Sequence, residues 1–183
     1  MEIVSQTFLK EKLSLITELE IGKQMDNIIP RIKDIAIKFS IAQKDKKSPF
    51  RNVLAVAAES SSSVEIIKNY IRYQVGRSGS SPIWKTSKDS KLFATAVVEH
   101  IDNLSHDAQT IVDILRRFIR DGELHSYLET SENQEQLKKN IHLKLTQLFL
   151  GYLAREHTAI VGEEKAKAAN NTQTESKHQP IRK

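Results

Sequence analysis

Cysteine is absent from this chain of 183 residues, so disulfide bonds are excluded and nothing indicates an oxidising compartment. Long hydrophobic runs are absent too, and the first residues, MEIVSQTFLKEKL, carry Glu2 and Glu11 where a signal peptide would be apolar. Glycine is scarce, with six residues scattered singly, so the sequence contains no glycine-rich phosphate-binding loop. These absences predict a cytoplasmic protein that does not span a membrane.

Motifs for catalysis are also missing, although the chain has six histidines. His106 and Asp107 form the dipeptide of helical metal-dependent phosphohydrolases, but the nearest upstream histidine, His100, lies too close in sequence to supply the further ligand. Asp107 is better explained as a residue that starts a helix, where a carboxylate suits the helix dipole. We therefore expect no enzyme, no metal site, no cofactor and no small-molecule substrate.

Apolar residues recur at helical spacing through most of the sequence, and no strand-like alternation is found. The pattern predicts an all-α fold, a single compact bundle of about five to seven helices over residues 1–161. Residues 162–183 contain one branched aliphatic residue and no aromatic residue, so they cannot bury enough apolar surface to offset the entropy of ordering. They are predicted to form a disordered polar tail.

Several helix boundaries can be predicted from residues that cap or interrupt helices. Pro30 should begin or bend a helix, because proline removes a backbone donor inside one. Ser105 should cap a new helix after one that spans about 88–103, and the last helix should run from Ser131 to about His157. The loop over 78–91 is rich in serine and contains Gly79 and Pro82, so it should lie at the surface.

The stretch 49–77 is the most informative, and it predicts two short helices joined by a serine-rich corner. Pro49 suits the first position of the first helix. Ser62 and Glu65 form a capping box that begins the second helix, and Gly76 is a natural residue to end it. At about 100° per residue this second helix has a core side, a second apolar side and a basic flank between them. The core side holds Val64, Ile67, Ile71 and Val75, the second apolar side Ile66, Tyr70 and Tyr73, and the flank Lys68 and Arg72.

The net charge of +5 is unevenly distributed along the chain. Residues 49–92 hold seven Lys and Arg against three acids, whereas residues 93–129 hold three against seven. A basic segment beside an acidic one suits a surface that meets phosphates on one side and protein on the other. A mildly basic domain without any role in nucleic-acid binding has the same composition, so both interpretations stay open.

The sequence does not determine the roles of two residues in the basic segment, Arg51 and Trp84. Arg51 lies in the first turn of its helix, where a cation opposes the helix dipole and gains nothing locally. Trp84 could stack on a base, or it could fill the edge of the core, which is more common for a lone tryptophan in a loop.

Three strings resemble the small helical subunit of type III CRISPR effector complexes: SPFRNVLAVA, NYIRYQVGR and LFLGYLAREH. In that family a helix opens with an arginine, a Tyr-x-x-Gly-Arg ending follows, and a C-terminal helix carries aromatic packing. Arg51 matches the first feature, the segment from Tyr73 to Arg77 the second, and Phe149 with Tyr152 the third. The resemblance covers roughly residues 48–157.

The resemblance implies a non-catalytic protein that packs against other effector subunits, including copies of itself, and lines the channel where guide RNA pairs with target RNA. Contacts to the RNA backbone would hold any sequence, because base pairing makes the sequence choice. A helical protein–protein adaptor without RNA binding is the alternative. The residues expected to contact RNA are Arg51, Lys68, Arg72, Arg77 and Lys85, and those expected to contact a neighbouring subunit are Ile66, Tyr70 and Tyr73.

Overall fold

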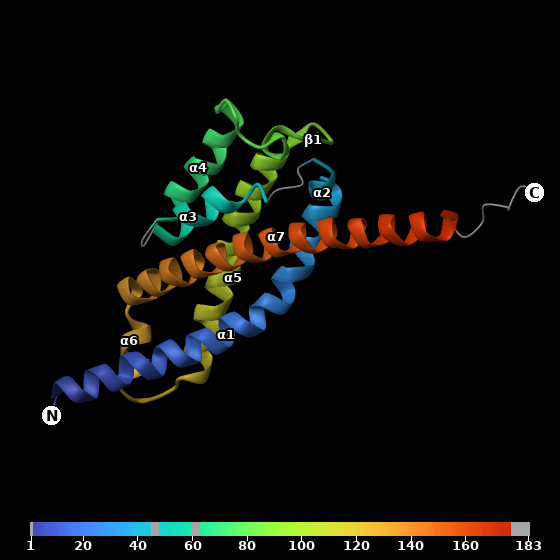
Figure 1. The fold of residues 1–183 in the computed structure, drawn as a ribbon. Helices are drawn as coiled ribbons and strands as arrows, with labels where there is room; N and C mark the ends of the chain where they lie inside the picture. The colour runs from blue at the N-terminus through green and yellow to red at the C-terminus, as the bar shows by residue number, and fades with distance from the viewer. Residues whose placement is uncertain (1, 45–47, 60–62, 177–183) are drawn as a thin grey trace, which may run out of the picture.

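A computed structural model gives the structure of the protein and describes residues 2–44, 48–59 and 63–176. The predicted all-α fold is confirmed: the described residues form seven α-helices, six of them substantial, packed compactly (Figure 1). The α-helices are α1 (Glu2–Lys38), α2 (Ile41–Lys44), α3 (Arg51–Glu59), α4 (Val64–Gly76), α5 (Phe93–Phe118), α6 (Gly122–Glu129) and α7 (Ser131–Ser176). A 3-10 helix, η1 (Pro82–Lys85), and two short strands, β1 (Ser87–Lys88) and β2 (Lys91–Leu92), complete the order.

Helix α7 is the element against which most of the others pack. It contacts α1, α3, α5 and α6 along its length, and in Figure 1 it runs between α1 on one side and the α3–α4 pair on the other. Its inner face supplies Leu145, Phe149 and Leu153, all at most 1% exposed. Full burial of each such side chain contributes about 1.5–3 kcal/mol, so this stripe is a substantial part of the core.

Pro30 lies inside helix α1, so of the two expectations for this residue, that it begins or bends a helix, the first is wrong. The helix runs unbroken from Glu2 to Lys38 with Pro30 inside it, on the exposed side. Ile28 and Ile32, on either side of the proline, are each 1% exposed in the core. An interior proline costs about 3 kcal/mol, and burial of these two isoleucines offsets it.

Helix α5 corrects a second boundary. The predicted break before Ser105 does not exist, because α5 continues from Phe93 to Phe118. Leu104 and Ala108 are buried on either side of the expected start, at 1% and 0% exposure, so the core stripe continues through it. Asp107 is therefore not a helix-start residue.

The last helix also extends further than predicted. It begins at Ser131 as expected but ends at Ser176 rather than near His157. Residues 163–169 are helical and exposed, and they follow the last part of the helix that contributes to the core, where Ile160 is half-buried. Residues 177–183, the end of the predicted tail, lie outside the described residues.

Helix α4 has the predicted span, with different details at its start. It ends at Gly76, and the Arg77 backbone N–H donates to the Tyr73 carbonyl. The predicted cap Ser62 lies outside the described residues, and Ser63 takes the N-cap position without a side-chain hydrogen bond. The predicted 78–91 loop contains η1 and an antiparallel ladder in which Ser87 pairs with Leu92.

Candidate nucleic-acid interface

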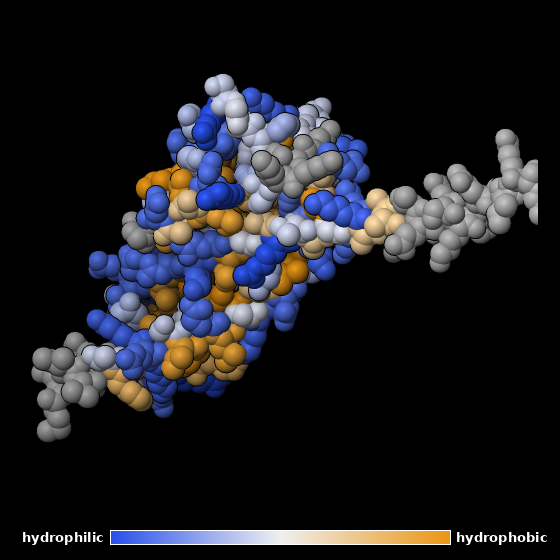
Figure 2. All heavy atoms as spheres, in the orientation of Figure 1, coloured by the Kyte–Doolittle hydropathy of each residue, from blue (hydrophilic) through white to orange (hydrophobic). Residues whose placement is uncertain are grey.

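The outer face of α4 carries the three predicted interface residues. Ile66 and Tyr73 are each 55% exposed, while Tyr70 is half-buried and its ring centroid lies 6.0 Å from that of Tyr73. On the opposite face, Ile67 and Ile71 are fully buried, as the helical period predicted. Helix α4 therefore has one side committed to the core and an apolar side open to solvent, and Figure 2 shows hydrophobic side chains at the surface beside α3 and α4.

Four of the five predicted RNA-binding cations lack a carboxylate partner among the residues that the structure describes. We call these four the basic surface: Arg51, Arg72, Arg77 and Lys85. Arg51, Arg72 and Lys85 are exposed, and Arg77 is half-buried. The nearby acids are engaged elsewhere, since Glu65 and Asp89 each form an ion pair with a lysine outside the basic surface.

Contacts within the fold connect three members of the basic surface. Phe50, the residue before Arg51, packs edge-on against Trp84 with ring centroids 5.6 Å apart. Lys85 follows Trp84, and its Nζ donates to the backbone carbonyl of Arg77 at 3.4 Å. The start of α3, helix η1 and the end of α4 are thus joined, so three of these cations lie on elements that contact one another.

The fifth predicted cation, Lys68, has a different environment. Its Nζ lies 2.6 Å from Glu65 Oε1 and 2.7 Å from Asp102 Oδ1, and only 16% of the side chain is exposed. Burial lowers the pKa of Lys68, but the hydrogen bonds to Asp102 and Glu65 more than offset this and raise it above the ordinary value. Lys68 therefore already has two carboxylate partners, which would compete with a phosphate.

Trp84 packs inside the fold, which decides between its two predicted uses. It is 1% exposed, and its ring centroid lies 5.4 Å from that of Phe93 in addition to its contact with Phe50. A ring so enclosed has no free face on which a base could stack. The role in packing is confirmed, and Trp84 instead supports the position of Lys85.

A cleft lies between α4 and α5 beside the basic surface. We call it the α4–α5 cleft; its volume is about 560 Å³. Sequence reasoning had identified its α4 side through Ile66, Lys68 and Arg72 but missed the contribution of α5, because no periodicity within one helix reveals which helix packs beside it. It is lined by Glu65, Ile66, Lys68, Asn69, Arg72, Val98 and Asp102.

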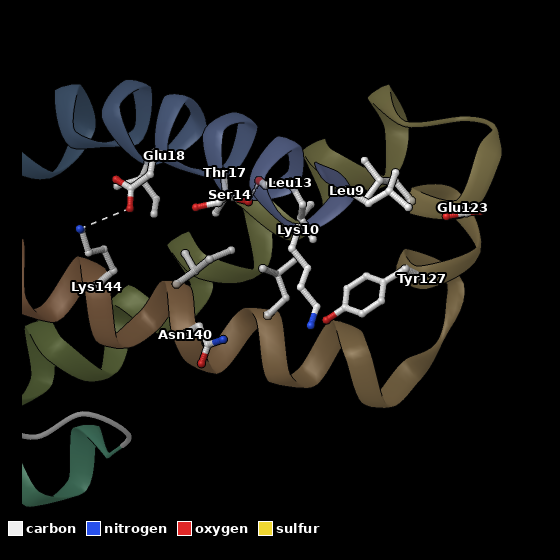
Figure 3. A pocket seen from close by; sticks show the side chains of 14 residues that line it. Leu9, Lys10, Leu13, Ser14, Thr17, Glu18, Glu123, Tyr127, Asn140 and Lys144 are labelled. Carbon is white, nitrogen blue, oxygen red and sulfur yellow. Dashed lines mark hydrogen bonds and ion pairs between the residues drawn. The ribbon is translucent and has the colours of Figure 1, made fainter. Parts of the chain in front are cut away.

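A second hollow lies at the other end of the molecule, where α1, α6 and α7 meet (Figure 3). This groove measures about 650 Å³, and most of its wall is apolar, with Leu9, Leu13 and Leu137 among the lining residues. Its charged groups balance one another, since Lys144 Nζ pairs with Glu18 Oε1 at 3.3 Å. It has none of the excess positive charge that a phosphate would require.

Asp107, the carboxylate of the rejected phosphohydrolase dipeptide, has a structural partner. Arg31 Nη2 of α1 lies 2.7 Å from Asp107 Oδ2, and Gln24 Nε2 donates to the other carboxylate oxygen at 2.7 Å. Within the described ranges, no three His, Asp or Glu side chains are placed to hold a metal ion together. In the same ranges no helix is both long and apolar enough to cross a membrane.

Comparison with known proteins finds no family model, no curated protein and no solved structure that matches this chain.

Proposed function

We propose that the protein is a non-catalytic, RNA-binding small subunit of a type III CRISPR effector complex, acting in the cytoplasm in antiviral defence. The basic surface would hold the backbone of guide and target RNA. Ile66, Tyr70 and Tyr73 would contact a neighbouring subunit, either another effector protein or a second copy of this chain. The sequence resemblance over residues 48–157 suggested this role.

The observation that carries the proposal is the basic surface without internal carboxylate partners. A cation that stabilises the fold usually sits beside a carboxylate, as Arg31 does beside Asp107. Arg51, Arg72 and Lys85 are exposed and have no carboxylate partner among the described residues. Cations placed in this way can neutralise phosphates and release counterions without first breaking an ion pair.

The test is the salt dependence of RNA binding. Affinity for a single-stranded RNA should fall with salt by about 0.7 log units per phosphate contact per decade. Replacing Arg51 and Arg77 together by alanine should flatten that slope by roughly one to two contacts. Lys12→Ala, which removes an exposed lysine of α1, is the matched control and should leave the slope unchanged. A slope equal to that of the wild type in the double variant would contradict the assignment of both arginines.

A helical protein–protein adaptor is the second candidate, favoured by the exposure of Ile66 and Tyr73. Both proposals use the apolar side of α4 as a contact with another protein. They differ in whether the cations of the basic surface bind RNA. If the protein binds no RNA at low salt, while Tyr73→Ser weakens its association with partner subunits or with itself, the adaptor function is supported instead. Sedimentation velocity at several protein concentrations measures self-association directly.

A further inference from the structure

The α4–α5 cleft differs from the basic surface because it combines carboxylates with a cation and an apolar wall. Ile66 from α4 and Val98 from α5 provide aliphatic groups, and Arg72 is the cation without a carboxylate partner. Glu65 and Asp102 place two negative charges in the same cleft, where they would repel a phosphate. With Lys68 and Arg72 present, the formal charges of the lining cancel.

Lys68 fixes the two carboxylates from a half-buried position. It engages Glu65 Oε1 and Asp102 Oδ1, and the second oxygen of each carboxylate has no hydrogen-bond partner among the described residues. The pKa of Lys68 is held above its ordinary value by these bonds despite burial, so the lysine stays charged at neutral pH. The cleft therefore presents two oriented acceptor oxygens beside an apolar wall.

Acceptor oxygens beside an apolar wall suit one kind of RNA group better than a phosphate. A nucleobase has a flat apolar face, and adenine, cytosine and guanine carry an exocyclic amino group that donates hydrogen bonds, whereas uracil has none. Single-stranded RNA presents unstacked bases whose edges are free for such contacts. A volume of about 560 Å³ is within the usual range for small-molecule sites, so the cleft has enough volume for one nucleotide.

We propose that the α4–α5 cleft receives one unstacked nucleotide of single-stranded RNA and favours bases that bear an exocyclic amino group. Ile66 and Val98 contact the face of the base, which leaves Tyr70 and Tyr73 for the neighbouring subunit. The free oxygens of Asp102 and Glu65 accept from the amino group of the base. Arg72, which also belongs to the basic surface, binds the RNA backbone next to the cleft rather than within it. This assignment rests on the proposed function and deepens it: the basic surface holds the backbone, and the cleft discriminates among bases.

The experiment compares two pyrimidine oligomers, dye-labelled rC12 and rU12, by fluorescence anisotropy at constant salt. Cytosine presents an amino group where uracil presents a carbonyl oxygen, so the wild type should bind rC12 more tightly by about 3–10-fold, the range that one hydrogen bond supplies. Asp102→Asn should reduce this preference, because the amide can also donate to the uracil oxygen. Asp113→Asn changes an exposed carboxylate of the same helix outside the cleft and should leave the preference intact.

The outcomes separate the inference from the function on which it rests. Equal binding of rC12 and rU12 by the wild type, or an undiminished preference in Asp102→Asn, overturns the cleft assignment and leaves the backbone-binding proposal standing. Binding of neither oligomer overturns both. Ile66→Ser provides a second variant that keeps the Lys68 ion pairs. Because Ile66 is 55% exposed, this variant should fold, and the inference expects it to weaken rC12 binding, so an unchanged rC12 affinity also contradicts it.

Discussion

The basic surface and the junction between α1 and α5 both contain arginines, yet their surroundings are opposite. At the junction, Arg31 reaches across to Asp107 at 2.7 Å, and Gln24 donates to the same carboxylate. On the basic surface, Arg51 and Arg72 have no carboxylate within the described part of the chain. The ion pair between Arg31 and Asp107 has a structural role, because it joins helix α1 to helix α5. The arginines of the basic surface have no role in folding that the structure shows, which is why we assign them to an external anion.

The largest expected difference lies between two adjacent residues, Trp84 and Lys85. Trp84→Ala removes a ring that is 1% exposed and packs against Phe50 and Phe93, so the free energy of unfolding should fall by about 3–5 kcal/mol. Lys85→Ala, at an exposed position, should change it by no more than about 0.5 kcal/mol. Urea denaturation monitored by circular dichroism measures both. A similar loss in the two variants would show that the basic surface itself stabilises the fold.

The next largest effect on stability is expected from the ion pair between Arg31 and Asp107. Asp107→Ala leaves Arg31 and Gln24 without their acceptor at a partly buried site, and should lower the free energy of unfolding by about 1–3 kcal/mol. Combining it with Arg31→Ala should cost less than the sum of the two single changes, since the same interaction is removed in each. Additive losses would show that the pair does not couple α1 to α5.

A smaller effect is expected from pH at the same junction. Burial, followed by the positive charge of Arg31, lowers the pKa of His100, whose ring stacks on Phe149 at a centroid distance of 5.8 Å. The folded state therefore binds fewer protons at His100 than the unfolded state does, and stability should fall as the pH drops below about 6.5. The loss should be detectable between pH 7 and pH 5. Urea denaturation at both pH values should show a smaller pH-dependent loss in His100→Gln, and an equal loss in variant and wild type would contradict this assignment.

The smallest expected change is in the stability of variants of the basic surface. Arg51→Ala and Arg72→Ala should each alter the free energy of unfolding by no more than about 0.5 kcal/mol, because neither side chain has a carboxylate partner in the described structure. Thermal unfolding with and without RNA provides the measurement. The variants should match the wild type when free, and RNA should stabilise them less. A large loss in the free protein would mean that the arginines serve the fold.

Predictions from the sequence were correct for properties that depend on a single helix. The period of α4 placed Ile67 and Ile71 on the core side and Ile66 on a different side, because side-chain direction within a helix follows from the backbone alone. The structure buries the first two and leaves Ile66 55% exposed. The predictions failed at Pro30 and Ser105, where local signals indicated a boundary. Both residues lie inside helices whose buried stripes continue past them, so packing against other helices outweighed the local preference.

The sequence by itself determined the helical class, the faces of α4 and the concentration of positive charge in residues 49–92, because composition and period are properties of the chain. Only the tertiary structure decided which of those charges stay free. Lys68 and Arg72 lie one helical turn apart on α4, and the sequence shows only that Lys68 has one carboxylate, Glu65, three residues before it. The approach of α5 brings Asp102 to Lys68 and leaves Arg72 without a carboxylate partner, and an ion pair between two helices exists only once they are packed.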